Sequence, residues 1–200
     1  MGAAHRGAGS QSLRDRLPLV EGAVAGAVAY VVGLILTFLL LTIDGEYEFG
    51  DSPVLDAGTL DQVGWFFYSS HFANIEVSGS LFGQSETVTQ NVVSESSLQL
   101  PDPVFYLVPI VILIAASYVV VASLDLWEPA PADCAQAGMT VVIGYLPLAV
   151  VGIFLFSASG GVSGADASVG PELATSVLLV GLLFPLLFGA VGGLLSSQTQ

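Results

Sequence analysis

Four long apolar stretches alternate with acidic or turn-rich segments along this 200-residue chain. They cover residues 19–43, 104–124, 136–156 and 173–195, and their only charged side chain is Glu21. A helix rises about 1.5 Å per residue, so roughly 20 residues cross the ~30 Å hydrocarbon core of a bilayer. Such segments must be helical, because lipid offers no partners to backbone N–H and C=O groups. The sequence therefore predicts an all-α membrane protein, a bundle of four transmembrane helices.

All cationic side chains precede the first stretch. They are Arg6, Arg14 and Arg16, and the chain contains no lysine. Because cationic residues beside a transmembrane segment hold that end in the cytoplasm, we expect residues 1–18 and 196–200 on the cytoplasmic side of the cell membrane. A cleaved signal peptide is the competing interpretation, but the apolar stretch exceeds the roughly 7–15 residues of such a peptide's core.

This topology divides the connections into one inner and two outer loops. Residues 125–135 form the cytoplasmic loop, whereas residues 44–103 and 157–172 lie outside. The second outer loop is rich in Gly and Ser, which is typical of a flexible connection. Within it, Gly161-Val162-Ser163-Gly164 matches the Gly-x-Ser-Gly signature of rhomboid intramembrane proteases. No histidine occurs in the four stretches, so we favour the flexible connection over a protease.

The first outer loop contains a predicted short helix at residues 59–74. Leu60, Val63 and Phe67 share one of its faces. Trp and Tyr at such density are typical of the boundary between lipid and water, so we expect this helix flat on the outer leaflet or against the top of the bundle. The residues expected to form a contact surface there are Trp65, Phe66, Phe67, Tyr68 and His71.

A β-type pattern follows this helix. Residues 75–77 and 86–93 alternate between apolar and polar side chains, around Gly79 and Gly83. Alternation with period two, interrupted by glycine, predicts a small β-hairpin.

The charge balance is strongly acidic. The chain has 17 acidic residues against three cationic ones, for a net charge of −14. Such a surface repels itself at ordinary salt, whereas at about 1 M salt the Debye length falls to about 3 Å and screens the repulsion. We interpret the composition as that of a halophile, with an acidic protein of a low-salt organism as the alternative.

The segment Gly64-Trp65-Phe66-Phe67-Tyr68-Ser69-Ser70-His71-Phe72, together with the four-helix layout, resembles a haloarchaeal family of transmembrane proteins with a domain of unknown function. In that family a Gly-Trp-x-Phe-Tyr-x-Ala-His-Phe-like segment follows the first helix, and Ser70 stands here in place of Ala. The resemblance covers about the first 75 residues and implies an archaeal plasma membrane. It implies no activity.

His71 is the main candidate for chemistry. With Ser69, Ser70, Asp61 and Glu76 nearby in sequence, it could belong to a catalytic triad, or it could bind a metal with loop carboxylates. Triad residues meet through the fold rather than along one segment, and a zinc site needs more N or S ligands. We therefore expect a structural histidine and predict no catalytic residue, no metal site and no cofactor.

Small residues lie four apart in the first and fourth stretches. Such spacing lets helix backbones approach closely, and packing drives helix association in lipid. Two uses remain open, packing inside the bundle or contact in an oligomer. The residues concerned are Gly22, Gly26, Gly33, Gly189 and Gly193.

Two classes of function therefore remain. The first is a non-enzymatic membrane interaction or assembly protein, which contacts membrane lipid and either another membrane protein or further copies of itself, but no nucleic acid. The second is an oligomeric channel or transporter for a small solute. A cavity lined by Tyr, Ser and Thr would favour transport, whereas a filled bundle with an exposed apolar patch outside would favour interaction.

Overall fold

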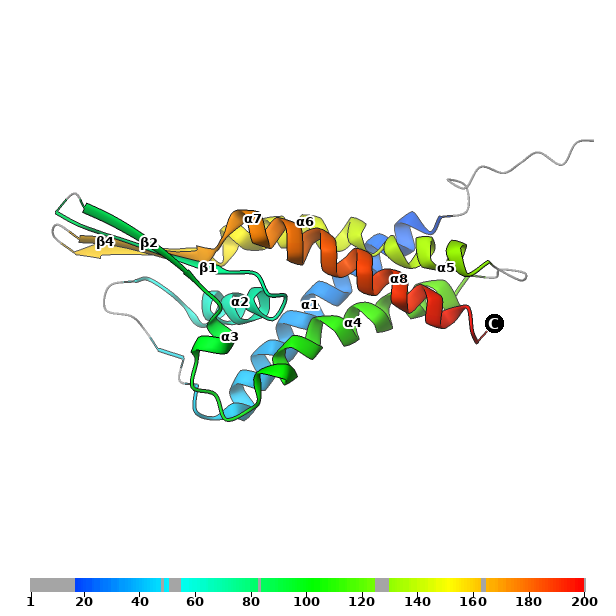
Figure 1. Cartoon of the computed structure of the whole chain (residues 1–200), viewed down its shortest axis with the longest axis horizontal. Helices are drawn as coiled ribbons and strands as arrows, with labels where there is room; N and C mark the ends of the chain where they lie inside the picture. Colours follow the sequence, from blue (N-terminus) through cyan, green and yellow to red (C-terminus); the bar gives the residue numbers. More distant parts are fainter. Residues whose placement is uncertain are drawn as a thin grey trace, which may run out of the picture.

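The protein is an elongated helical bundle with a β-sheet extending from one end and the C-terminus at the other (Figure 1). The computed structural model describes residues 17–47, 49–50, 55–82, 84–124, 130–162 and 165–199. Four helical segments in it are long and apolar enough to cross a membrane. They are α1 (Leu19–Asp44), α4 (Asp102–Ala122), the pair α5 (Pro131–Met139) and α6 (Val142–Leu155), and the run of α7 (Leu173–Thr175), η2 (Ser176–Leu183) and α8 (Phe184–Ser196).

The third and fourth segments are not continuous α-helices. The third starts at Pro131 instead of residue 136, because proline fits the first turn of a helix, where its missing N–H is not needed. It breaks at Thr140, between α5 and α6. In the fourth, the π-helix η2 precedes Pro185. Proline cannot donate to the carbonyl four residues earlier, and the wider turn accommodates that gap.

The bundle is held together by close approaches at glycine. A methyl group on Gly26 would overlap the Val141 carbonyl, and one on Gly144 would overlap the Ala23 carbonyl, so α1 and α6 touch backbone to backbone. All five glycines expected to mediate packing lie against another part of the same chain. Their neighbours are Thr140 for Gly22, Val141 for Gly26, Phe67 for Gly33, Gly138 for Gly189 and Cys134 for Gly193.

The sheet contains two hairpins. Their strands are β1 (Ile75–Leu81), β2 (Gln84–Gln90), β3 (Ala158–Val162) and β4 (Ala165–Pro171), in the order β2-β1-β4-β3 with every pair antiparallel. The expectation of a flexible connection at 157–172 was wrong. Its Ser and Gly residues alternate with Ala and Val, so β4 can pair along the full length of β1, from Ile75↔Pro171 to Leu81↔Ala165.

The short helix predicted at residues 59–74 is α2 (Thr59–Ser69), and of its two expected positions it takes the one against the end of the bundle and does not lie flat on the surface. It fills the wedge at the sheet end of the bundle, between α1 and α4 on one side and α6 and α7 on the other (Figure 1). A short helix, α3 (Val92–Glu95), links the sheet back to α4. We refer to α2 and the turn after it, residues 59–72, as the plug helix.

Candidate functional site

The plug helix contacts all four long helical segments. The Phe67 ring lies against Gly33, which is 11 residues, or about 16 Å of helix, from the end of α1. The aromatic rings of the plug helix pack against rings from all four segments, which are Tyr30 of α1, Phe105 of α4, Phe156 at the end of α6 and Phe184 of α8. The aromatic residues of the plug helix are therefore the centre of the protein's core.

Gly64 and Trp65 fix the plug helix to α6. A methyl group on Gly64 would overlap the Phe156 ring, so only glycine allows this approach. The indole Nε1 of Trp65 donates to the Phe156 carbonyl at 2.7 Å. Together these contacts set both the distance and the rotation of the helix relative to α6.

His71 is fully buried and both of its ring nitrogens are hydrogen-bonded. Its Nδ1 lies 2.7 Å from the Phe67 carbonyl, and its Nε2 lies 2.8 Å from the Tyr145 hydroxyl. A carbonyl can only accept, so Nδ1 carries the proton and donates, and Nε2 of the neutral ring accepts from Tyr145. Neither nitrogen is free to act as a base or to bind a metal.

Two further tyrosine hydroxyls, those of Tyr30 and Tyr68, complete the buried polar core. Tyr68 donates to the Ala149 carbonyl, and its oxygen lies 3.0 Å from the Tyr30 hydroxyl. Because Tyr68 uses its single proton on Ala149, Tyr30 donates to Tyr68. A methyl group on Gly152 would overlap both hydroxyls, so the glycine leaves room for the pair. These tyrosines thus join α1, the plug helix and α6.

The residues expected to form an external contact surface lie inside the protein. Phe66, Phe67, Tyr68 and His71 are buried, and Trp65 is half-buried, so this set is not a docking surface. The reason is physical: a run of aromatic rings stabilises a helix more by packing between four helices than by lying at an interface open to water.

A catalytic triad around His71 is absent from the described geometry. The Ser70 hydroxyl donates to a main-chain carbonyl at 2.6 Å, and Asp61 accepts from the backbone at the start of α2 at 2.8 Å. Among the residues described, no group of three His, Cys, Asp or Glu side chains could hold a metal ion. Ser163, the serine of the protease-like motif, lies outside the described residues. Cys134 is buried.

Burial lowers the pKa of His71 to about 3, well below its ordinary value of 6.5, and the Phe67 hydrogen bond only partly opposes this. His71 follows α2 and lies outside the four long segments. Its ring is therefore neutral throughout the physiological pH range, in agreement with a structural role.

The two faces of the sheet differ in character. On one face hydroxyls stand side by side across the strands, in the pairs Ser78↔Thr87, Ser80↔Ser85 and Ser159↔Ser168. The Ser78 and Thr87 oxygens are 2.9 Å apart. We call this the hydroxyl face. Alternation along each strand places the apolar residues on the opposite side.

The opposite, apolar face is covered only near the bundle. There Ile75 and Val169 are buried. Val88 lies in the same row of the sheet as Val169, but on the edge strand β2, and is 53% exposed. Leu81, at the far end of β1, is 57% exposed. Phe82, in the turn after β1, is 84% exposed and has a positive φ of 49°. Glu86 is the acidic residue on this face, opposite Gly79. We define Leu81, Phe82 and Val88 as the distal patch.

The whole chain, residues 1–200, matches the model of a family of unknown function, DUF7978. The chain belongs to this family. Among curated proteins and solved structures, none matches it. The DUF7978 match brings no activity with it, so the function must be argued from the geometry of the helices and the sheet.

Proposed function

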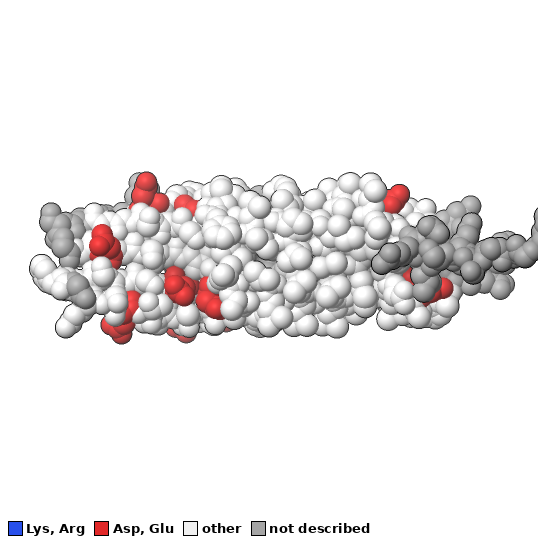
Figure 2. Space-filling model, turned by 90° about the horizontal axis from the view of Figure 1, so that it is seen from above, with Lys and Arg blue, Asp and Glu red and all other residues white. Residues whose placement is uncertain are grey.

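We propose that this protein is a multi-pass plasma-membrane protein that holds the distal patch outside the cell as a contact surface for another protein. On the face that Figure 2 shows, acidic side chains lie at both ends of the molecule, with a broad band without charged side chains between them. Such a band matches the hydrocarbon core of a bilayer, and exposed valines and leucines of the long helices then face lipid. The acidic ends suit a halophile's salt concentration.

The exposed end of the sheet is the observation that carries the interaction role. Monomeric proteins rarely leave large apolar side chains together in water, and such patches mark contact sites. Strand β2 is exposed along its whole length and forms one edge of the sheet. A partner with an apolar surface would cover Leu81, Phe82 and Val88 while the hydroxyl face stays in water.

The transporter alternative has less support. Its expected signature was a cavity lined by Tyr, Ser and Thr, but the Tyr30, Tyr68 and Tyr145 hydroxyls are engaged inside a packed core. The plug helix occupies the space between the four segments at the sheet end. The same engagement of His71 supports a non-enzymatic role.

The membrane topology predicts opposite labelling of the two ends. In a variant with Cys134→Ala, we expect Ser85→Cys in β2 to react with a membrane-impermeant maleimide on intact cells. Ser197→Cys, which follows α8, should react only after lysis. The arginines before α1 are the physical reason, since they hold the N-terminus and therefore, after four crossings, the C-terminus inside. The reverse labelling pattern would refute the orientation.

The contact role predicts that crosslinking depends on the face of the sheet. A photoreactive phenylalanine analogue at Val88 should yield a discrete crosslinked product in living cells. The same analogue at the neighbouring Thr87, also exposed but on the hydroxyl face, is the matched control and should yield little. Equal products from both faces, or none from either, would contradict the proposal.

A further inference from the structure

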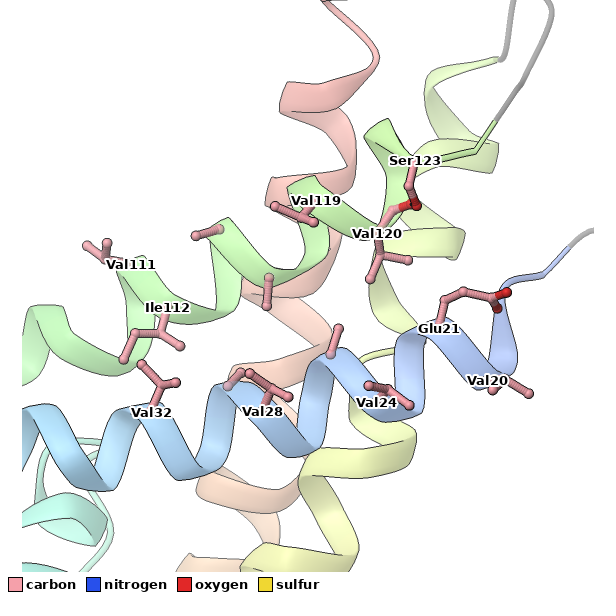
Figure 3. Close-up of a pocket in the computed structure, with 14 residues that line it drawn as sticks. Val20, Glu21, Val24, Val28, Val32, Val111, Ile112, Val119, Val120 and Ser123 are labelled. Atoms are coloured by element: carbon pink, nitrogen blue, oxygen red, sulfur yellow. The ribbon is translucent and has the colours of Figure 1, made fainter.

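A groove of about 720 Å³ runs along the bundle between α1 and α4 (Figure 3). One wall consists of side chains four residues apart on α1, which share a helix face. The whole lining is Val, Ala and Ile except for Glu21 and Ser123, which lie at the same end of the groove on opposite walls. Valine has one strongly preferred rotamer in a helix, so the walls are stiff.

The groove tapers. α1 and α4 lie close together at Val32 and Ile112 and draw apart toward Val20 and Ser123 (Figure 3). The exposed fraction along the α1 wall changes in the same direction, from 38% at Val32 to 72% at Val20. The narrow end is therefore wholly apolar, and the wide end has the two polar side chains.

The identity of the occupant follows from the surroundings and the shape, given the membrane placement proposed above. The groove opens sideways into hydrocarbon, and a void there would forfeit dispersion contacts, so it is filled. From Val20 to Val32 the groove is about 18 Å long. Because it narrows toward one end, it fits an extended alkyl chain better than a helix of constant diameter.

The two polar side chains at the wide end of the groove determine which kind of lipid head group can bind there. The Ser123 hydroxyl donates its proton to the Val120 carbonyl at 2.7 Å, which leaves its lone pairs as acceptors. The carboxylate of Glu21 can only accept. Both groups therefore present acceptors to whatever lies at the end of the groove.

We propose that the groove binds one membrane lipid, with its alkyl chain between α1 and α4 and a head group that offers N–H or O–H donors to Glu21 and Ser123. With the N-terminus cytoplasmic, this lipid belongs to the inner leaflet. The site is separate from the plug helix and from the distal patch.

Lipid retention tests the proposal with a matched pair of variants. The protein is reconstituted in vesicles of equal amounts of phosphatidylethanolamine, phosphatidylglycerol and phosphatidylcholine and extracted in mild detergent. The lipids retained per chain are then counted by native mass spectrometry. Val28→Phe places a ring in the groove, whereas Val151→Phe adds the same bulk at an equally exposed position on α6, 58% against 56%.

We expect wild type and Val151→Phe to retain one lipid per chain, preferentially one of the two with donor-bearing heads. Val28→Phe should retain about tenfold less, since even one methylene in an apolar pocket changes binding by that order. Glu21→Leu should keep the lipid but weaken the preference for phosphatidylethanolamine over phosphatidylcholine, because leucine offers no acceptor.

Several results would overturn the proposal. They are equal retention in Val28→Phe and Val151→Phe, no preference for donor-bearing heads in wild type, or a disulfide-linked dimer of Val24→Cys in place of bound lipid. That last result would assign the groove to a second copy. A failure of the distal patch to crosslink a partner would leave the lipid count unchanged, so the two proposals fail separately.

Discussion

Gly26→Ala is expected to destabilise the bundle by about 3 kcal/mol, at the upper end of the cost of overpacking a core. The added methyl group would overlap the Val141 carbonyl, and neither backbone can move without separating α1 from α6. The better helix propensity of alanine, worth about 1 kcal/mol, offsets only part of this loss. The measurement is thermal or denaturant unfolding in detergent, followed by helical circular dichroism.

Gly33→Ala is the control in the same helix. There the new methyl group would come within 2.6 Å of Cε2 of the Phe67 ring, a side chain that can rotate slightly. We expect a loss of about 1 kcal/mol after the same propensity gain. Equal losses at Gly26 and Gly33 would show that the α1–α6 backbone contact does not limit the packing.

The four long helical segments could be predicted from sequence because their signal is local. Some 20 successive residues without charge leave few alternatives to a helix, and the first segment was placed within one residue of its observed end at Asp44. The break at Thr140 and the π-helix before Pro185 were not predicted. They depend on how backbones adjust around proline and around neighbouring helices, which apolar length does not encode.

The choice between the two expected positions of the plug helix could not be made from sequence, because an aromatic run suits both a lipid interface and a crowded core. The deciding features are distant in sequence. Gly33 and Gly152 leave space in two other helices, and Tyr145 and Ala149 provide the partners for His71 and Tyr68. One available clue was His71 itself. It stands among aromatic residues in the sequence, with no cation and no set of metal ligands nearby, and such surroundings suit a buried, neutral ring.

The second hairpin was missed for a related reason. Residues 157–172 have the composition of a linker, and their β-structure depends on the edge that β1 offers after pairing with β2. Serine and glycine have weak strand preference alone, but pairing with a formed strand determines the outcome. The alternation Ala167, Ser168 and Val169 was the local sign of it.

The buried, neutral state of His71 predicts an acid-sensitive fold. The ring binds a proton in the unfolded chain near pH 6.5, but in the folded protein only near pH 3, because burial lowers its pKa. Between these values the unfolded state holds more protons, so this contribution to stability is complete above pH 6.5 and is lost progressively as the pH falls toward 3. At pH 5 the loss amounts to about 2 kcal/mol, at 1.36 kcal/mol per pH unit.

His71→Gln separates this effect from the titration of the many carboxylates. Glutamine can still donate to the Phe67 carbonyl and accept from Tyr145, but it does not titrate. We expect the variant to be less stable than wild type at pH 7 and to lose about 2 kcal/mol less between pH 7 and pH 5, measured by unfolding in the same detergent. The acidic groups contribute equally to both curves, so the difference between them belongs to residue 71. Parallel curves for the two proteins would mean that His71 is protonated as readily in the folded core as in the unfolded chain, which its burial between Phe67 and Phe184 opposes.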